Sequence, residues 1–296
     1  MISESIMKLD GGDIAMRTIG DTDAEYTFLF LHGWQDNCAT FDTTISAVFE
    51  LSDVHYCVSF DWAGHGWSTF RGANDFYHFA DYVDLLHQVI ARLPNNKLII
   101  IGHSLGALVA SCYCAAFPEK VFTLVMIEGL GPLSEPSDNA SKRLREGVLS
   151  RSRVRLKPSR ALKNKEEALF LRSQVNQLPE VLLKPVVDRG TYFDGEAVRW
   201  SHDPKLKCDS LYRMSEAQAL DIVSHIECPV LAILGEKGYS RLKNMHARIE
   251  CFKQIELETM EGGHHCHLEN PKLTAMRIIA HVKSVNQSLT SYSVQS

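Results

Sequence analysis

Short apolar runs recur along the chain, and segments with helical periodicity separate most of them. Strands are predicted at residues 14–19, 26–31, 54–60, 97–101, 121–127, 229–234 and 253–257. The run at 121–127 is apolar almost throughout, which is typical of a strand buried on both faces of a parallel sheet. Helices are predicted at 39–51, 74–93 and 271–285, and Pro94 ends the second of them. This alternation predicts an α/β fold with a mostly parallel central sheet and helices on both faces.

The alternation stops between residues 131 and 225. This stretch contains six prolines and helical patches at 163–177 and 179–188, but no convincing central strand. We therefore expect a core formed by residues 1–130 and 226–296, with residues 131–225 inserted into it. In the final predicted helix, the expected buried side carries Leu273, Met276, Ile279 and Ala280.

Composition narrows the class of protein. The chain has 296 residues, of which 45% are apolar, so it can bury one large core. A formal charge of −5 leaves no global basic field to hold nucleic acid. No apolar run approaches the length of a membrane span, and the first residues lack the layout of a secretory signal. We expect a cytoplasmic protein whose eight cysteines are free, buried thiols. The sequence does not determine its oligomeric state.

A glycine-flanked serine stands between a predicted strand and a predicted helix. Gly102, Ser104 and Gly106 form a Gly-x-Ser-x-Gly turn directly after the run at 97–101, and the helix after it breaks near Phe117. Such a turn forces the serine into a sparsely allowed backbone conformation. Strand and helix pass so closely that only glycine fits on either side. The pattern predicts an exposed, nucleophilic Ser104.

Three further segments, taken together with the serine turn, resemble a known family. They are Leu31-His32-Gly33-Trp34, Asp61-Trp62-Ala63-Gly64-His65-Gly66-Trp67-Ser68 and Gly262-Gly263-His264. Together with the serine turn they resemble the α/β-hydrolase fold superfamily, and within it the serine hydrolase-like proteins, from about Ile14 to Val285. The resemblance implies an α/β-hydrolase fold in which residues 131–225 form a mostly helical cap over the pocket. It also implies that the backbone N–H groups of Trp34 and Leu105 form an oxyanion hole.

A serine hydroxyl needs a base within hydrogen-bond reach and a third group that orients the base. His264 follows two glycines after the last predicted strand, where the chain is free to reach back over the sheet. The family pattern Gly-His-x-x-His-Leu-Glu-x-Pro is met from Gly263 to Pro271, and it selects His264 over His265. We therefore expect His264 to be the catalytic base.

The acid departs from the commonest family pattern. Many relatives carry an aspartate in a Gly-x-x-Asp setting after the strand at 229–234, but here that setting ends in Gly238. Glu128 ends the strand at 121–127, at the same sheet edge as Ser104 and Trp34, and a carboxylate beside a buried strand needs a partner. We favour Glu128 as the acid. Glu236 and an incomplete triad are the alternatives.

Other polar groups have structural and chemical interpretations. His32 either props its loop or acts directly, and Asp61 and His65 are expected to be architectural. The run 264–267 carries three histidines and a cysteine, but adjacent residues rarely bind one ion, so we expect no metal. The segment Ile127–Gly131 is only a weak dinucleotide motif, and we expect no cofactor.

A basic run stands out in this acidic chain. It is interpreted as a solvated face of the cap or as a surface that recognises an anionic substrate or partner. Its members are Lys142, Arg143, Arg145, Arg151, Arg153, Arg155, Lys157 and Arg160.

These residues predict a serine hydrolase that cleaves a carboxylic ester or similar small acyl substrate through an acyl-enzyme. Two alternatives remain open: a non-catalytic ligand-binding protein with an incomplete triad, and a carbon–carbon bond hydrolase on the same fold. A serine at position 104 disfavours reactions that need an aspartate nucleophile.

Overall fold

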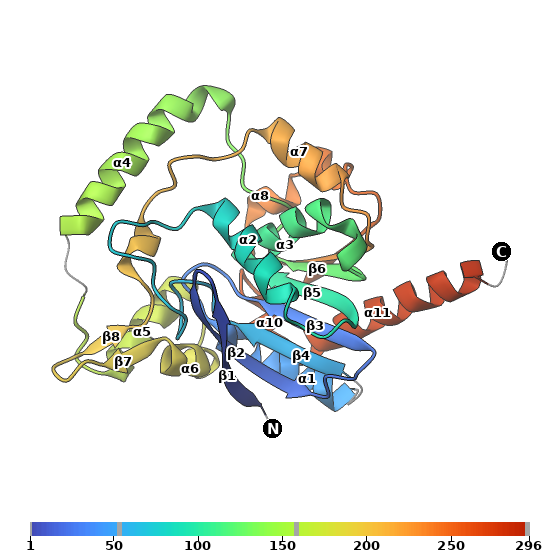
Figure 1. Cartoon of the computed structure of the whole chain (residues 1–296), viewed down its shortest axis with the longest axis horizontal. Helices are drawn as coiled ribbons and strands as arrows, with labels where there is room; N and C mark the ends of the chain where they lie inside the picture. Colours follow the sequence, from blue (N-terminus) through green and yellow to red (C-terminus); the bar gives the residue numbers. More distant parts are fainter. Residues whose placement is uncertain (1, 52–54, 157–159, 294–296) are drawn as a thin grey trace.

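An eight-stranded sheet forms the centre of the molecule in the computed structural model, which describes residues 2–51, 55–156 and 160–293 (Figure 1). The strand order is β1-β2-β4-β3-β5-β6-β9-β10. Strands β1, β2 and β4 pair antiparallel, and every other neighbouring pair is parallel. The bounds are β1 (Ser3–Leu9), β2 (Gly12–Gly20), β3 (Tyr26–Leu31), β4 (His55–Phe60), β5 (Lys97–His103), β6 (Thr123–Ile127), β9 (Val230–Gly235) and β10 (Ile255–Met260). The predicted α/β class and mostly parallel sheet are confirmed.

Strand β1 is the one strand of this sheet that the sequence did not predict. Its seven residues lie at the sheet edge and are mostly exposed, so no alternation of buried and exposed side chains marks it. The strand predicted at 54–60 corresponds to β4. Its predicted first residue, Val54, lies outside the described residues, and β4 begins at His55. The remaining predicted strands agree with the structure to within two residues at most ends.

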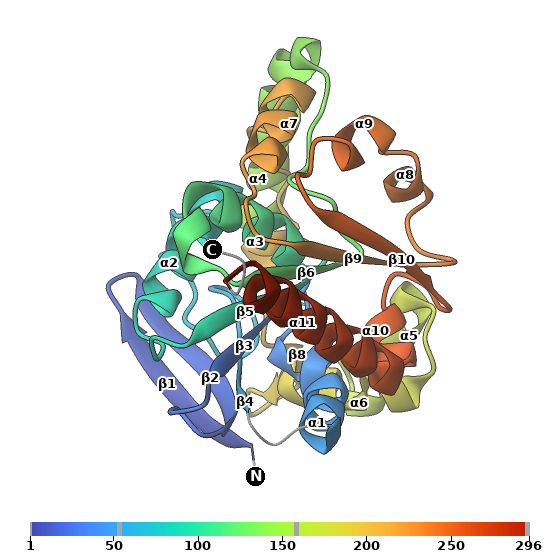
Figure 2. The ribbon, with the colours of Figure 1, turned by 90° about the vertical axis from the view of Figure 1, so that its right-hand side faces the viewer.

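Helices cover both faces of the sheet (Figure 2). Helices α1 and α11 pack together on one face, whereas α2 and α3 pack together on the other, where α7 joins α3. The core helices are η1 (Cys38–Phe41), α1 (Asp42–Leu51), α2 (Phe79–Ile90), α3 (Leu105–Ala116), η2 (Pro118–Lys120), α8 (Ser240–Lys243), α9 (His246–Ile249), α10 (Cys266–Glu269) and α11 (Pro271–Ser293). The sheet therefore separates two hydrophobic cores.

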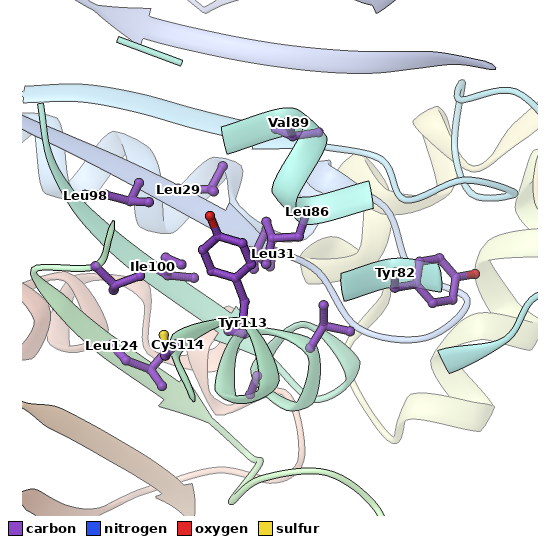
Figure 3. Close-up of a cluster of buried hydrophobic side chains, with 14 of the residues drawn as sticks. Leu29, Leu31, Tyr82, Leu86, Val89, Leu98, Ile100, Tyr113, Cys114 and Leu124 are labelled. Atoms are coloured by element: carbon purple, nitrogen blue, oxygen red, sulfur yellow. The ribbon is translucent and has the colours of Figure 1, made fainter. Parts of the chain in front are cut away.

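The core beneath α2 and α3 shows how the sheet supports the serine turn (Figure 3). Leu86 and Val89 from α2 and Tyr113 from α3 pack on Leu29 and Ile100 of the central strands, and all five are buried. Burying side chains of this size stabilises the fold by about 1.5–3 kcal/mol each. Strand β5 and helix α3, which flank Ser104, are thus fixed on a rigid base.

The buried face of α11 differs from the prediction. Leu273, Met276 and Ala280 are exposed, and only Ile279 of the predicted set is buried. The buried stripe instead runs through Thr274, Ala275, Ile278, Ile279 and Val282. Both stripes fit a helical period, so periodicity did not distinguish them. The buried stripe is the one that packs into the core shared with α1.

A matched pair of substitutions tests this assignment. Ile278→Ala should lower the free energy of unfolding by about 2–4 kcal/mol, because it leaves a cavity in the core beneath α1 and α11. Leu273→Ala should cost about 0.5 kcal/mol or less, because Leu273 is on the solvent side. Urea unfolding of the two variants measures the difference, and equal losses would contradict the assignment.

The inserted segment contains helices and one hairpin. Its elements are η3 (Ser137–Asn139), α4 (Ala140–Leu156), α5 (Lys165–Asn176), α6 (Glu180–Arg189), β7 (Thr191–Phe193), β8 (Val198–Trp200), η4 (Pro204–Lys207) and α7 (Glu216–Ser224). Helices α5 and α6 confirm the two predicted helical patches, whereas the β7–β8 hairpin was not predicted. The division into a core and a cap at residues 131 and 225 stays a prediction, because α7 packs on core helix α3.

Arg189 at the end of α6 ties the insert to the core. Its buried guanidinium donates to the buried carboxylate of Asp61, with an Nε to Oδ2 distance of 2.9 Å, and also pairs with Glu4. The guanidinium lies 4.2 Å from the ring centre of Trp67. Asp61 accepts two further hydrogen bonds from the backbone N–H groups of Cys38 and Trp67. The architectural role expected for Asp61 is therefore confirmed.

The basic run mostly occupies α4, a helix with few buried residues. Arg143 pairs with Glu135, and Lys142 and Arg153 approach Glu146 and Asp209, each to 3.9 Å. Arg151 and Arg155 lie over the ring of Phe76, and Arg160 pairs with Glu167. Lys157 lies outside the described residues. These contacts fit a solvated face better than a shared anion site.

All eight cysteines are free, as predicted, but only six of them are buried, because Cys208 and Cys251 are partly exposed. Among the described residues, no helix combines the length and apolarity needed to cross a lipid bilayer.

Candidate active site

Ser104 lies in a strained turn between β5 and α3. Its backbone angles are φ 49° and ψ −114°, a conformation that costs residues other than glycine about 1–3 kcal/mol. A Cβ at Gly102 would lie 2.4 Å from the backbone nitrogen of Ala107, and one at Gly106 would lie 2.0 Å from the carbonyl oxygen of Leu31. Both glycines are therefore required by the close approach of helix and strand, as the sequence predicted.

The loop after β3 lies against this turn. A Cβ at Gly33 would be 3.4 Å from Cβ of Ser104, so the loop that carries Trp34 is adjacent to the serine. Leu105 is the first residue of α3, and the first N–H groups of a helix have no partner inside it. Trp34, Ser104 and Leu105 line the same cavity. These positions suit the expected oxyanion donors.

Two buried histidines support the loops beside the turn. The Nδ1 of His32 lies 2.7 Å from the carbonyl oxygen of Gly33, and its Nε2 accepts from the backbone N–H of Trp62 at 3.0 Å. The Nε2 of His65 accepts from the backbone N–H of Gln35 at 3.1 Å. Burial lowers the pKa of each histidine to about 3, which keeps both rings neutral. Both act as structural supports.

Glu128 is placed at the end of β6 by an unusual backbone conformation, with a φ of 52°. Its side chain is buried, with 3% of the residue exposed, and each carboxylate oxygen has a partner. Oε1 accepts from the N–H of Gly235 at 2.8 Å, and Oε2 accepts from the N–H of Tyr239 at 3.1 Å. Oε2 also lies 3.1 Å from Nδ1 of His264. The partner that a carboxylate beside a buried strand requires is thus His264, the predicted base.

Gly238 explains why the commoner aspartate is missing from this chain. A Cβ at position 238 would lie 2.1 Å from Oε1 of Glu128, so the carboxylate of Glu128 occupies the space that a side chain there would need. Glu236, the alternative acid, is exposed. Among the described residues, its carboxylate makes no hydrogen bond or ion pair. The geometry favours Glu128 over Glu236 as the partner of His264.

His264 is held close to the serine turn by its neighbours. Its backbone carbonyl lies 2.8 Å from Nε2 of His103, the residue that precedes Ser104. Its ring packs on the rings of His103 and Tyr239, with centre-to-centre distances of 4.8 Å and 4.2 Å. In the described part of the chain, the Ser104 hydroxyl makes no hydrogen bond, which is common for catalytic pairs before substrate binds.

A buried polar cluster lies beside His264, and the sequence did not predict it. One ligand atom from each of Asp36, His103 and His265 lies within 4.8 Å of the others, a spacing that could hold a metal ion. However, the guanidinium of Arg172 lies 3.6 Å from Asp36 and already supplies a positive charge. Burial raises the pKa of Asp36, which Arg172 counteracts. These residues are far apart in the chain, so no sequence spacing could have linked them.

A cavity of about 800 Å³ opens over the serine turn. Core residues including Trp34, Ser104 and Tyr239 line one side, and residues 206–214 of the insert line the other. This volume suits a small organic ligand. The sequence did not predict Tyr239 or the lining residues of the insert, because their positions depend on how distant segments pack.

The family comparison agrees with this architecture. A family model described as the alpha/beta hydrolase fold matches residues 26–271. A serine hydrolase-like protein of Dictyostelium discoideum is 27% identical over 288 residues, covering 91% of this chain and 78% of that protein. Serine hydrolase-like protein 2 of Homo sapiens is 26% identical, with coverage of 93% and 92%.

Solved structures show the same fold over almost the whole chain. A hypothetical protein from Pseudomonas aeruginosa PAO1 superimposes with a TM-score of 0.86 at 28% identity, covering 95% of this chain and 99% of that one. A thioesterase domain from the curacin biosynthetic pathway gives a TM-score of 0.80 at 20% identity, with coverage of 94% and 99%. At that identity the likeness concerns the fold alone.

Proposed function

Because this chain belongs to the α/β hydrolase family, we propose that it is a serine hydrolase that uses Ser104, His264 and Glu128 on small acyl compounds such as carboxylic esters. The observation that carries the proposal is the contact between the buried carboxylate of Glu128 and Nδ1 of His264, next to the strained Ser104 turn. This contact supports a scheme in which a nucleophile, a base and an orienting acid from three separate loops act together. The names of the curated relatives support a hydrolase.

The proposed reaction begins with proton transfer. Glu128 fixes the ring of His264 with its Nδ1–H directed at the carboxylate, so Nε2 is left to take the proton of the Ser104 hydroxyl. Ser104 then attacks the acyl carbonyl, and the N–H groups of Trp34 and Leu105 stabilise the oxyanion. Each such donor contributes about 3–4 kcal/mol in enzymes of this kind. The leaving group departs with the proton from His264.

The second half of the proposed reaction releases the acyl group from Ser104. Water enters the cavity, His264 removes its proton, and the resulting hydroxide attacks the ester carbonyl of the acylated Ser104. Collapse of the second tetrahedral intermediate breaks the bond to Ser104, which recovers its proton from His264. The products are a carboxylic acid and the leaving-group alcohol or thiol, and no cofactor takes part in this scheme.

A fluorophosphonate probe tests the proposal against the non-catalytic alternative. The probe should label the folded wild-type protein at Ser104, because an activated serine attacks phosphorus as it attacks a carbonyl. Ser104→Ala should abolish labelling. Ser134→Ala is the matched control: Ser134 lines the same cavity but hydrogen-bonds to Arg248 and Glu216. Intact mass and peptide mapping locate the adduct, and an unlabelled Ser104 in a folded protein would exclude the proposed chemistry.

A further inference from the structure

We propose that the cavity over Ser104 selects acyl compounds that carry a negative charge, and that Arg213 and Arg241 recognise this charge. The inference rests on the proposed function, since it names the substrate class of the same cavity. Its basis is a comparison of the arginines that line the cavity: one of them has a carboxylate partner, and two do not.

Among the described residues, three arginines line this cavity. Arg248 is neutralised, because its Nη2 lies 2.6 Å from Oε2 of Glu216. Arg213 and Arg241 form no ion pair within the described part of the chain. Arg213 and Arg241 therefore line the cavity without a direct carboxylate partner, and the carboxylates that also line it are Glu128 and Asp209.

The carboxylates near Arg213 are engaged elsewhere. Glu135 receives two hydrogen bonds from Nε of Arg143, at 2.9 and 3.1 Å, and Asp209 lies 3.9 Å from Arg153. Burial, followed by the charges of Arg143 and Arg241, lowers the pKa of the Arg213 guanidinium, and the charges of Glu135 and Asp209 counteract only part of this shift. Like charges that repel one another in a partly buried place are stabilised when an anion binds between them.

The two arginines reach the cavity from different parts of the fold. Arg241 lies at the start of α8, with its guanidinium carbon 5.5 Å from the ring centre of Tyr239, the same ring that packs on His264. Arg213 belongs to the insert and precedes Met214, whose carbonyl accepts from the N–H of Glu135 at 3.0 Å. An anion held by both would bridge the core and the insert close to His264.

The chemistry of a guanidinium narrows the class of charged group. Its planar fork of N–H donors matches the oxygens of a carboxylate or a phosphate. Two substrate types would present such a group: an acyl chain ending in a carboxylate, and a thioester whose leaving group carries phosphates. The shared feature is an oxyanion a short distance from the reacting carbonyl.

Three substrates that share an acyl carbonyl and the three carbons next to it separate these cases. The neutral reference is 4-nitrophenyl butyrate, the carboxylate form is mono-4-nitrophenyl glutarate, and the phosphate form is butyryl-coenzyme A. The wild-type protein should show a higher kcat/KM for one charged substrate than for the neutral one. The ratio of charged to neutral kcat/KM should fall about 10- to 100-fold in the double variant R213M/R241M, because charged hydrogen bonds are lost.

Arg277→Met is the matched control, because Arg277 is exposed on α11 and is not part of the cavity lining. It removes one positive charge and should leave the ratio within about twofold. Arg213→Lys should retain part of the preference, because it keeps the charge and loses the fork. Near-ultraviolet circular dichroism and fluorophosphonate labelling show whether each variant keeps its fold and its serine chemistry.

The outcomes distinguish this inference from the proposed function. If Ser104 is labelled and the neutral ester is cleaved, but the ratio is the same in wild type and double variant, the charge selection is wrong and the hydrolase proposal stands. If Ser104 is not labelled, the hydrolase proposal fails. Calorimetric titration with glutarate then tests the arginine pair without catalysis: binding that R213M/R241M abolishes supports it, and absence of binding overturns it.

Discussion

Replacing Glu128 with glutamine is expected to reduce the turnover of a 4-nitrophenyl ester about a thousandfold to ten-thousandfold. The amide keeps the size of the carboxylate, and its oxygen can still accept from the N–H of Gly235. It cannot provide the negative charge that orients the ring of His264 and stabilises it once protonated. The expected loss is therefore in kcat, and the steady-state rate of nitrophenol release measures it.

Glu236→Gln provides the control for this experiment. Glu236 has the same side chain and follows the neighbouring strand β9, but it is exposed. Its replacement should change kcat by less than about twofold. Circular dichroism should confirm that both variants fold. Equal activity of Glu128→Gln and wild type would exclude Glu128 as the acid, and a large loss in Glu236→Gln alone would transfer that role.

Acidification from pH 7 to pH 5 is expected to lower the free energy of unfolding by several kcal/mol. Burial lowers the pKa of His32, His65 and His267 to about 3, and it also lowers the pKa of His103 and His265. In the unfolded chain these rings bind protons below about pH 6.5. Stability is therefore complete above pH 6.5 and falls between there and pH 3, by about 1.4 kcal/mol per pH unit for each such histidine.

Buried carboxylates oppose part of this loss. Burial raises the pKa of Asp36 and of Asp42, so the folded state binds protons at these sites before the unfolded state does. Urea unfolding at pH 7, 6 and 5 measures the balance. His267→Gln should flatten the pH dependence, whereas the same change at the exposed His246 is the control. A free energy of unfolding that stays constant over this range would contradict the expectation.

The sequence predicted the parts of the site that depend on local geometry. The glycines around Ser104 and the carboxylate after β6 carry their signal in a few neighbouring residues, because backbone crowding and an unpaired charge are local constraints. Of the two roles that the sequence left open for His32, its hydrogen bonds favour support of the loop.

Other features depend on packing between distant segments and could not be predicted. The exposed edge strand β1 has no alternating pattern, and two stripes along α11 fit a helical period. The cluster of Asp36 with His103 and the shared cavity of Arg213 and Arg241 join residues from segments far apart in the chain. Their positions follow from how the insert and the last loops dock, which no period in the sequence encodes.

The overlap between Glu128 and any side chain at position 238 makes two catalytic layouts mutually exclusive. The acid can be at position 128, after β6, or at position 238, in the loop after β9. The carboxylate of Glu128 occupies the space that a side chain at position 238 needs, so both acids do not fit together. If the acid is moved from position 128 to position 238 by one substitution at a time, the intermediate variant has either two acids that overlap or no acid. Designers who wish to relocate the acid should therefore change both positions in one step.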